Sequence, residues 1–202
     1  LNKKVLGIIG LGRIGMAVAK MSTGFNMKIM GYDPVATPPE AEKLGIEITN
    51  NLEKIFREAD YITVHVPKND KTLNMIGAEQ LKMMKPTTRI INCARGGIIN
   101  EDALYDALEN KTIAAAALDV FTEEPPVNNK RYEKIANCLV TPHLGASTAE
   151  AQVEVAVEAA QILADYLKTG VIKNAVNAPA TGGAMPVVVE TYATLAQRIG
   201  ML

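Results

Sequence analysis

An apolar run followed by three closely spaced glycines, near the start of the chain, strongly constrains the fold. The run Val5–Ile9 leads into the pattern Gly-x-Gly-x-x-Gly. Gly10 can take a tight turn out of a strand, Gly12 lets the backbone approach a pyrophosphate, and Gly15 allows a helix to pack closely on the strand. The pattern predicts a dinucleotide-binding strand, turn and helix, although three glycines alone would also fit a purely structural turn.

An acidic residue after the second apolar segment supports the dinucleotide interpretation. Asp33 follows Met27–Tyr32 and comes 18 residues after Gly15. Its carboxylate is placed to accept hydrogen bonds from both ribose hydroxyls, which favours NAD over NADP. A helix that begins near Arg13 would direct free N–H groups at the phosphates. We therefore expect NAD as the cofactor.

Composition bounds the class of partner. The 202 residues are 48% hydrophobic, and 21 Lys and Arg balance 22 Asp and Glu. This balance argues against nucleic acid or a membrane surface and favours a small-molecule ligand. Two cysteines, Cys93 and Cys138, cannot form a disulfide framework, and the sequence has no signal peptide or long apolar run. We expect a cytoplasmic protein.

Short apolar runs alternate with helical patterns along the chain, which is typical of a parallel sheet covered by helices on both faces. The predicted strands are Val5–Ile9, Lys28–Tyr32, Ile46–Ile48, Tyr61–His65, Arg89–Asn92, Ala115–Asp119 and Leu139–Thr141. The predicted helices among them are Arg13–Ser22, Pro39–Leu44, Leu52–Glu58, Ala78–Met83 and Glu101–Glu109. The pattern predicts an α/β fold, a doubly wound (Rossmann) sheet of about seven strands in the order 3-2-1-4-5-6-7.

A long alanine-rich helix should follow the last strand. Ser147-Thr-Ala-Glu150 fits a capping box, and the helix should run to about Lys168 and stop at Gly170.

The predicted domain organisation follows from this helix. We expect residues 1–170 to form an NAD-binding domain that includes the helix, and residues 171–202 to return toward a substrate-binding domain. An apolar, helix-compatible pattern resumes over 187–202, after a linker rich in Gly and Pro. The chain also opens on Leu1 instead of a methionine, so we expect a piece of a larger protein. The N-terminal part of the substrate-binding domain would then be missing, and the isolated fragment would bind NAD with little or no turnover.

Three loops after the predicted strands carry chemistry-bearing side chains. Arg95 lies in Asn92-Cys-Ala-Arg-Gly-Gly97, Glu124 in Asp119–Pro126, and His143 in Thr141–Ala146. Ligands of such sheets bind beyond the carboxyl ends of the strands, where these loops meet. An arginine, a carboxylate and an imidazole are therefore expected at one site.

These groups suit hydride transfer from an alcohol carbon, which also requires removal of the hydroxyl proton. His143 can take that proton, and a carboxylate on its other ring nitrogen would fix the tautomer and stabilise the imidazolium. Arg95 offers a planar fork for a substrate carboxylate, although a surface ion pair is the commoner role of an arginine. Glu124, fixed by the following proline, is the better partner of His143 than Glu123, which is expected to be solvated. His65 is expected to serve packing or the shape of the cofactor loop.

Six motifs together resemble the D-isomer-specific 2-hydroxyacid dehydrogenases. They are Gly10-Leu-Gly-Arg-Ile-Gly15, Tyr32-Asp33-Pro34, His65-Val-Pro67, Asn92-Cys-Ala-Arg-Gly-Gly97, Ala117-Leu-Asp-Val-Phe121 with Glu123-Glu-Pro-Pro126, and Pro142-His-Leu-Gly-Ala-Ser-Thr148. The resemblance spans roughly residues 3 to 180. It implies that Arg95 binds the substrate carboxylate and that Glu124 and His143 form the acid–base pair. It also implies cofactor contacts, which join the glycines and Asp33 in the full predicted set: Gly10, Gly12, Arg13, Ile14, Gly15, Asp33, Val66, Cys93, Ala94, Arg95, Asp119, His143, Leu144, Gly145 and Ala146.

The resemblance implies an NAD-dependent oxidoreductase, homo-oligomeric in its parent protein, without a metal. The motifs are most like those of family members that oxidise 3-phosphoglycerate to 3-phosphohydroxypyruvate, the entry step of serine synthesis. Other 2-hydroxy acids, as in glyoxylate or hydroxypyruvate reductases, stay open, as does an NAD(H)-sensing corepressor with the same fold. An unrelated sugar or alcohol dehydrogenase is disfavoured, because Tyr166 and Lys168 have the wrong spacing for a Tyr-x-x-x-Lys pair. Cys93 and Cys138 are also too few for a typical zinc cluster.

Overall fold

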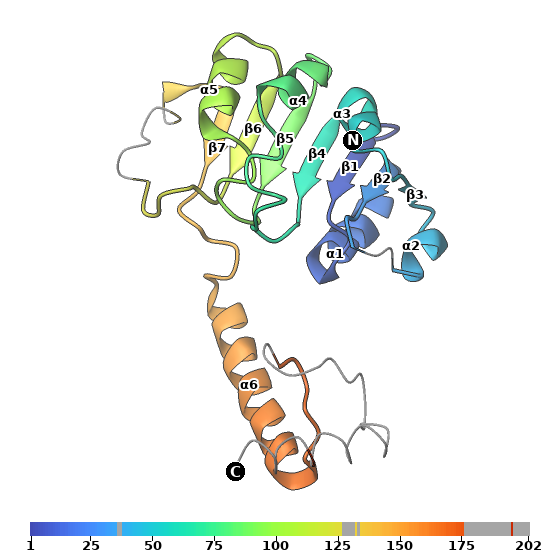
Figure 1. Cartoon of the computed structure of the whole chain (residues 1–202), viewed down its shortest axis with the longest axis vertical. Helices are drawn as coiled ribbons and strands as arrows, with labels where there is room; N and C mark the ends of the chain where they lie inside the picture. The colour runs from blue at the N-terminus through green and yellow to red at the C-terminus, as the bar shows by residue number, and fades with distance from the viewer. Residues whose placement is uncertain (36–37, 127–131, 133, 176–194, 196–202) are drawn as a thin grey trace. The chain divides into compact units, whose positions relative to one another are not determined.

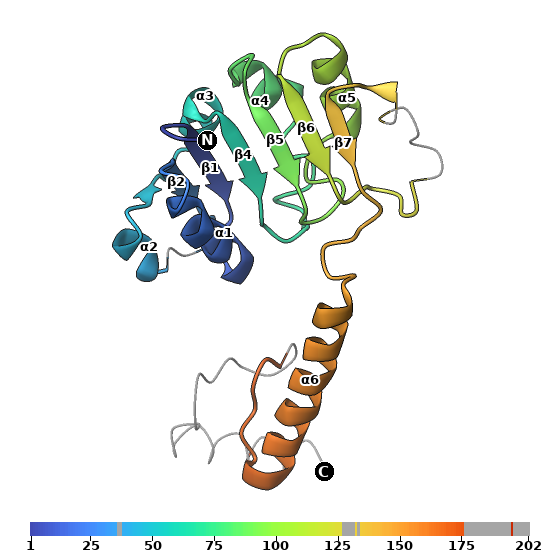
Figure 2. The same cartoon turned by 180° about the vertical axis from the view of Figure 1, so that it is seen from behind.

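The structure is a computed structural model and describes residues 1–35, 38–126, 132, 134–175 and 195. The chain divides into two compact units, Leu1–Gly145 and Ala146–Leu202. The first holds the sheet and the second a long helix (Figures 1 and 2).

The first unit is built on one seven-stranded sheet in the order β3-β2-β1-β4-β5-β6-β7, and every neighbouring pair is parallel. The strands are β1 (Val5–Ile9), β2 (Lys28–Tyr32), β3 (Glu47–Ile48), β4 (Tyr61–Val64), β5 (Arg89–Asn92), β6 (Ala115–Leu118) and β7 (Cys138–Val140). The predicted doubly wound fold and strand order are confirmed. The order reverses between β1 and β4, so a crevice is expected beyond their carboxyl ends.

Helices cover both faces of this sheet, as Figures 1 and 2 show. They are α1 (Arg13–Thr23), α2 (Glu40–Lys43), α3 (Leu52–Glu58), α4 (Ala78–Met83) and α5 (Glu101–Glu109). Side chains alternate across a strand, so β1 feeds two separate cores. Ile8 packs with Ala19 of α1 in one cluster, whereas Ile9 packs with Phe56 of α3 in the other. Burial of the two sheet faces therefore drives the fold.

Several strand ends differ from prediction by one residue. The ladders of β4 and β6 stop before His65 and Asp119, because these residues already begin the loops beyond the sheet. His65 N still donates to the carbonyl of Ile9 at 2.7 Å. The outermost strand β3 is also one residue shorter than predicted and comprises Glu47–Ile48. Ile46 is buried but does not pair with β2.

The second unit contains α6 (Ala149–Thr169), which ends at Gly170 as predicted, in a left-handed conformation with φ 71°. The predicted cap at Ser147 is wrong by one residue. Thr148 is the N-cap, because its backbone is extended and its hydroxyl accepts a hydrogen bond from Ala151 N at 3.1 Å. Apart from Leu195, the predicted helical segment 187–202 lies outside the described residues.

Candidate functional site

The three predicted chemical groups follow three neighbouring strands. Arg95 comes after β5, Glu124 after β6 and His143 after β7. Because β5, β6 and β7 are paired in parallel, their carboxyl ends meet at one edge of the sheet. The loops that carry Glu124 and His143 are therefore brought together although their side chains lie 19 residues apart in sequence.

Glu124 and His143 form a close pair. The distance from Glu124 Oε2 to His143 Nδ1 is 2.6 Å. An ionised carboxylate can only accept, so Nδ1 carries the proton in this bond and Nε2 is the ring nitrogen that can exchange a proton with a substrate. The side chains are 34% and 48% exposed, so the pair is open to a ligand while still held in place.

The environment of Glu124 favours its charged form. Its other oxygen, Oε1, accepts a hydrogen bond from Phe121 N at 2.9 Å. This backbone bond, followed by the bond to His143 and the positive charge of Arg95, outweighs partial burial and lowers the pKa of Glu124. The geometry therefore places an ionised carboxylate against the imidazole of His143, near the positive charge of Arg95.

Arg95 is exposed on a turn that the following glycines make possible. Its Nη1 donates to the carbonyl of Ala94 at 2.6 Å. A Cβ on Gly96 would lie 1.9 Å from the carbonyl oxygen of Phe121, and Gly97 has φ +82°. Only glycine fits this close approach, so the turn of Arg95 packs directly against the loop that leads to Glu124.

His143 lies in a turn that Asp119 holds. The residue itself has a left-handed backbone, with φ 56°. Asp119 Oδ1 accepts from Leu144 N at 2.7 Å and from the hydroxyl of Thr141 at 2.5 Å, while Oδ2 accepts from Gly145 N at 2.9 Å. Burial opposes ionisation of Asp119, but these hydrogen bonds outweigh it and lower its pKa. The carboxylate thus fixes the loop that presents the imidazole.

This clamp was not predicted from the sequence, which assigned Asp119 a cofactor contact. The register offers the missing signal: Leu118 pairs with Val140, so Asp119 and Thr141 leave adjacent strands side by side. Asp119 follows the last residue of β6 and Thr141 follows the last residue of β7. Their side chains can therefore form a hydrogen bond beyond the carboxyl ends of these two strands. The strand alignment needed for that inference is visible only in the folded sheet.

Asp119→Asn should destabilise the fold by about 1.5 to 3 kcal/mol at neutral pH, because hydrogen bonds to a charged acceptor are lost. The pKa of Asp119 is lowered on folding, so its contribution is present above its unfolded pKa and is lost as pH falls through the folded value. Thermal unfolding from pH 7 to 3 should therefore show the variant and the native protein converging in acid. Asp106→Asn, an exposed acid on α5, is the matched control. A difference in Tm that stays constant with pH would contradict the assignment.

The glycine turn after β1 fits the pyrophosphate of a dinucleotide. Gly10 has φ +99°, and a Cβ on Gly15 would lie 2.0 Å from the carbonyl oxygen of Gly10. A Cβ on Gly12 would meet no atom within 4 Å, so its open side leaves a cradle for a ligand. No side chain caps α1 at Gly12, and the first turn carries no acid. The first amides of α1 are consequently suited to a phosphate.

Asp33 lies beside this turn. Its Oδ2 accepts from Leu11 N at 2.7 Å and its Oδ1 from Val35 N at 2.8 Å. These two bonds fix the carboxylate beside the glycine turn, where the sequence motif predicts an acceptor for the ribose hydroxyls. Arg13 and Ile14 begin α1, and the side chain of Ile14 is 68% exposed. Together these residues fit the adenosine and pyrophosphate of NAD.

Other predicted residues occupy distinct surroundings. The ring of His65 contacts the hydroxyl of Thr63 at 3.0 Å, and burial lowers its pKa, in keeping with a packing role. Val66 is buried. Burial and the charge of Asp119 raise the pKa of the Cys93 thiol, which favours its neutral form. Ala146 begins the second unit, and its predicted cofactor contact stays a prediction.

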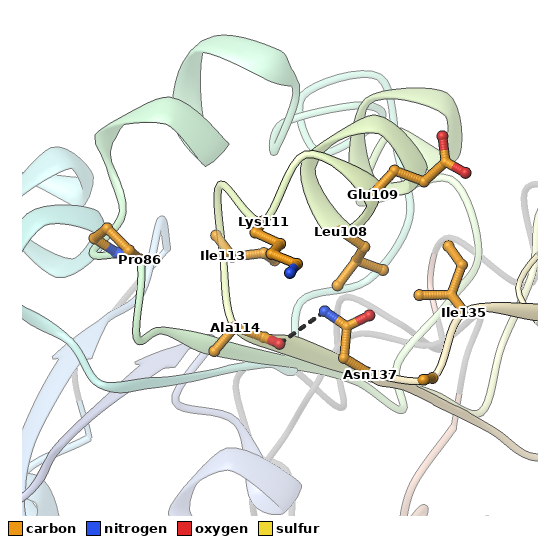
Figure 3. Close-up of a pocket in the computed structure, with 9 residues that line it drawn as sticks. Pro86, Leu108, Glu109, Lys111, Ile113, Ala114, Ile135 and Asn137 are labelled. Atoms are coloured by element: carbon orange, nitrogen blue, oxygen red, sulfur yellow. Dashed lines mark hydrogen bonds between the residues drawn. The ribbon is translucent and has the colours of Figure 1, made fainter.

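A cavity of about 580 Å³ lies away from this site (Figure 3). Pro86 precedes β5, Ile113 and Ala114 precede β6, and Asn137 precedes β7, so the cavity sits at the amino ends of these strands. Asn137 Nδ2 donates to the carbonyl of Ala114 at 2.8 Å. The cavity is therefore at the sheet edge opposite the loops of Arg95, Glu124 and His143.

The described part of the chain offers neither a metal site nor a membrane-spanning helix. No cluster of at least three His, Cys, Asp or Glu side chains is arranged to hold a metal ion in this part of the chain. Nor does any helix among these residues combine the length and hydrophobicity that spanning a bilayer requires.

Comparison with known proteins identifies the family. A family model described as D-isomer specific 2-hydroxyacid dehydrogenase, NAD binding domain, matches residues 1–145. The chain belongs to this family. The resemblance inferred from the motifs is thereby confirmed, and NAD is the cofactor of this type of domain.

Individual relatives agree with the assignment of this dehydrogenase domain. The chain is 47% identical to the D-3-phosphoglycerate dehydrogenase of Synechocystis sp., covering 99% of the chain and 36% of the relative. It is 44% identical to the protein of that name from Methanocaldococcus jannaschii, covering 98% and 37%. A crystal structure of a glyoxylate reductase from Paecilomyes thermophila superposes with a TM-score of 0.79 at 32% identity, covering 87% of this chain and 53% of that one. The chain spans less than two fifths of the curated relatives.

Proposed function

We propose that the chain is the NAD-binding domain of an enzyme that oxidises 3-phosphoglycerate to 3-phosphohydroxypyruvate. The hydrogen bond of 2.6 Å between Glu124 and His143, beside the charge of Arg95, carries the proposal of dehydrogenase chemistry. The names of the two curated relatives support the choice of substrate. The reaction would be the first step from phosphoglycerate toward serine. A cytoplasmic location and a homo-oligomeric parent protein stay predictions from the sequence.

In this proposal the three side chains divide the work on the substrate. Arg95 holds the carboxylate with its planar fork, and its charge favours the developing carbonyl oxygen. His143 Nε2 takes the hydroxyl proton as the alcohol carbon loses a hydride, and the Glu124 carboxylate stabilises the resulting imidazolium. When bound, NAD supplies the hydride acceptor. In the reverse reduction, the protonated imidazole returns the proton to the oxygen.

The cofactor would be held by the amino end of α1 and by Asp33, which follows β2. The backbone amides at Gly12 and Arg13 would bind the pyrophosphate, and Asp33 would accept from the adenosine ribose. The loop of His143 and Leu144 would border the nicotinamide. Cys93 and Ala94 would border the same end of the cofactor. These roles are proposed from the open side of Gly12, the exposed position of Ile14 and the shared sheet edge.

Turnover by the complete enzyme tests the proposal. Reduction of NAD is measured with 3-phosphoglycerate, glycerate and lactate, and oxidation of NADH is measured with 3-phosphohydroxypyruvate and glyoxylate. We expect the highest kcat/KM with the phosphorylated pair. A preference for glyoxylate would favour a reductase like the structural relative, and NAD binding without turnover of any of these acids would overturn the enzyme assignment.

Asp33→Ala should weaken NAD binding by on the order of tenfold or more and relax the rejection of NADP. The substitution removes a charged acceptor for the ribose and a charge that repels a 2′-phosphate. Titration calorimetry with both coenzymes measures the two effects. Asp33→Asn removes the charge but keeps an oxygen that can accept the hydrogen bond from Leu11 N. Comparing the two variants therefore separates the effect of the charge from the effect of the bond that holds the glycine turn. Glu79→Ala, an exposed acid on α4, is the control. Unchanged affinity for both coenzymes in both Asp33 variants would refute the role.

A further inference from the structure

The carboxylate of Glu101, the first residue of α5, reaches the loop that leads to Glu124. Glu101 Oε1 accepts from Thr122 N at 2.6 Å and from the hydroxyl of Thr122 at 2.8 Å. The two residues lie 21 positions apart in sequence. One carboxylate oxygen thus receives both the backbone and the side-chain donor of a single loop residue.

Thr122 directly follows the residue that holds Glu124. Phe121 N donates to Glu124 Oε1 at 2.9 Å, while Glu124 Oε2 contacts His143 Nδ1 at 2.6 Å. A chain of hydrogen bonds therefore runs from Glu101 through the Phe121–Thr122 backbone to Glu124 and then to the imidazole. The N–H of Phe121 lies in the preceding peptide group and is joined to the Phe121–Thr122 peptide at the Cα of Phe121. Holding Thr122 N therefore restricts the rotation of the donor that orients the Glu124 carboxylate.

Packing limits the movement of the same peptide on other sides. Gly96 lies against the carbonyl of Phe121 so closely that a Cβ there would come within 1.9 Å of the oxygen. The ring of Tyr132 packs against Phe121 at a centroid distance of 6.2 Å, and its hydroxyl donates to the carbonyl of Glu101. Glu101 therefore contributes with its side chain and with its backbone to holding the loop.

Stabilisation of α5 alone does not account for this arrangement. Asn100 already caps the helix, because its side chain accepts from Ala103 N at 2.9 Å. An acid in the first turn would favour the helix dipole wherever its side chain pointed. The side chain of Glu101 instead takes both donors of Thr122, in a loop 21 residues away.

We propose that Glu101 is a positioning residue that holds Glu124 in the orientation required by His143. It touches neither substrate nor cofactor in this role and acts through the Phe121–Thr122 peptide. Its effect on turnover rests on the proposed function, whereas its effect on the loop does not. The two consequences are measured separately.

Hydrogen exchange of the complete protein tests the structural part. In Glu101→Gln and in Thr122→Val, the amides of Phe121 and Thr122 should exchange at least about tenfold faster than in the native protein, because their acceptors become mobile. Amides of β1 and β4 should keep their native rates. Asp106→Asn removes an exposed acid from the same helix and should change neither set. Native rates at Phe121 in both variants would overturn the proposal, and so would faster exchange throughout the sheet.

Kinetics test the catalytic part. Glu101→Gln should lower kcat by between about tenfold and about 100-fold with native NAD affinity, and the double variant with Glu124→Gln should be no slower than Glu124→Gln alone. Additive losses in the double variant, or a native kcat in Glu101→Gln, would overturn it. If the native enzyme turns over no hydroxy acid, the proposed function fails and the exchange rates alone decide whether Glu101 positions the loop.

Discussion

Replacing His143 with alanine in the complete enzyme should lower kcat by on the order of 100-fold or more while NAD affinity stays nearly native. The reason is geometric: Nδ1 is engaged by Glu124 at 2.6 Å, so the ring is held with Nε2 as the proton-exchanging atom. Alanine removes that atom and leaves the glycine turn after β1, where the cofactor phosphates are proposed to bind, unchanged. Steady-state kinetics and coenzyme titration measure the two quantities separately.

Graded variants of the neighbouring acids sharpen the test of His143. Glu124→Gln should lower kcat less, because an amide still bonds the ring but no longer carries the charge that supports the imidazolium. Glu123→Gln removes a charge one residue away and serves as the matched control, with native kinetics expected. Native kcat per folded molecule in His143→Ala, accompanied only by a lower Tm, would make the pair structural and favour an NAD(H)-binding protein without turnover.

The sheet could be predicted from the sequence because each strand carries its own local signal. Val5–Ile9 is continuously apolar, and the glycines after it permit a tight turn that few other residues could adopt. The alternation of strands with helices predicts a parallel sheet, and the glycine motif after the first strand is typical of doubly wound folds, whose strand order the prediction adopted. Strand ends were less certain, since His65 has a strand-like sequence but its side chain belongs to the loop.

The candidate site could be predicted only where loops follow adjacent strands. Glu124 and His143 were expected together because the strands before them are neighbours, and the structure places them 2.6 Å apart. The contact of Glu101 with Thr122 has no such signal, because it joins a helix start to a loop and depends on where one side chain points. The left-handed backbone of His143 and the clamp by Asp119 likewise arise from tertiary hydrogen bonds.

Arg95→Lys should raise KM for the hydroxy acid by about 10-fold to about 100-fold, with a smaller change in kcat. A planar guanidinium can grip a carboxylate with two parallel hydrogen bonds, each worth about 1.5 to 3 kcal/mol when charged, whereas an ammonium acts as a point charge. Here the guanidinium is also oriented by its own turn, since Nη1 donates to the carbonyl of Ala94 at 2.6 Å. KM and kcat over a series of substrate concentrations at saturating NAD give the result.

The same substitution at the other end of the strand controls for loss of an arginine as such. Arg89 begins β5, donates to the carbonyl of Thr87 at 3.1 Å and lies 5.5 Å from the ring centroid of Tyr61, so Arg89→Lys should leave KM native. Lysine keeps the positive charge that favours the ionised form of Glu124, so this interaction should survive in Arg95→Lys. The substitution should therefore weaken substrate binding and not the acid–base pair. A native KM in Arg95→Lys would show that the fork is not used, and a fall in kcat without a rise in KM would place Arg95 with the acid–base pair instead of the substrate carboxylate.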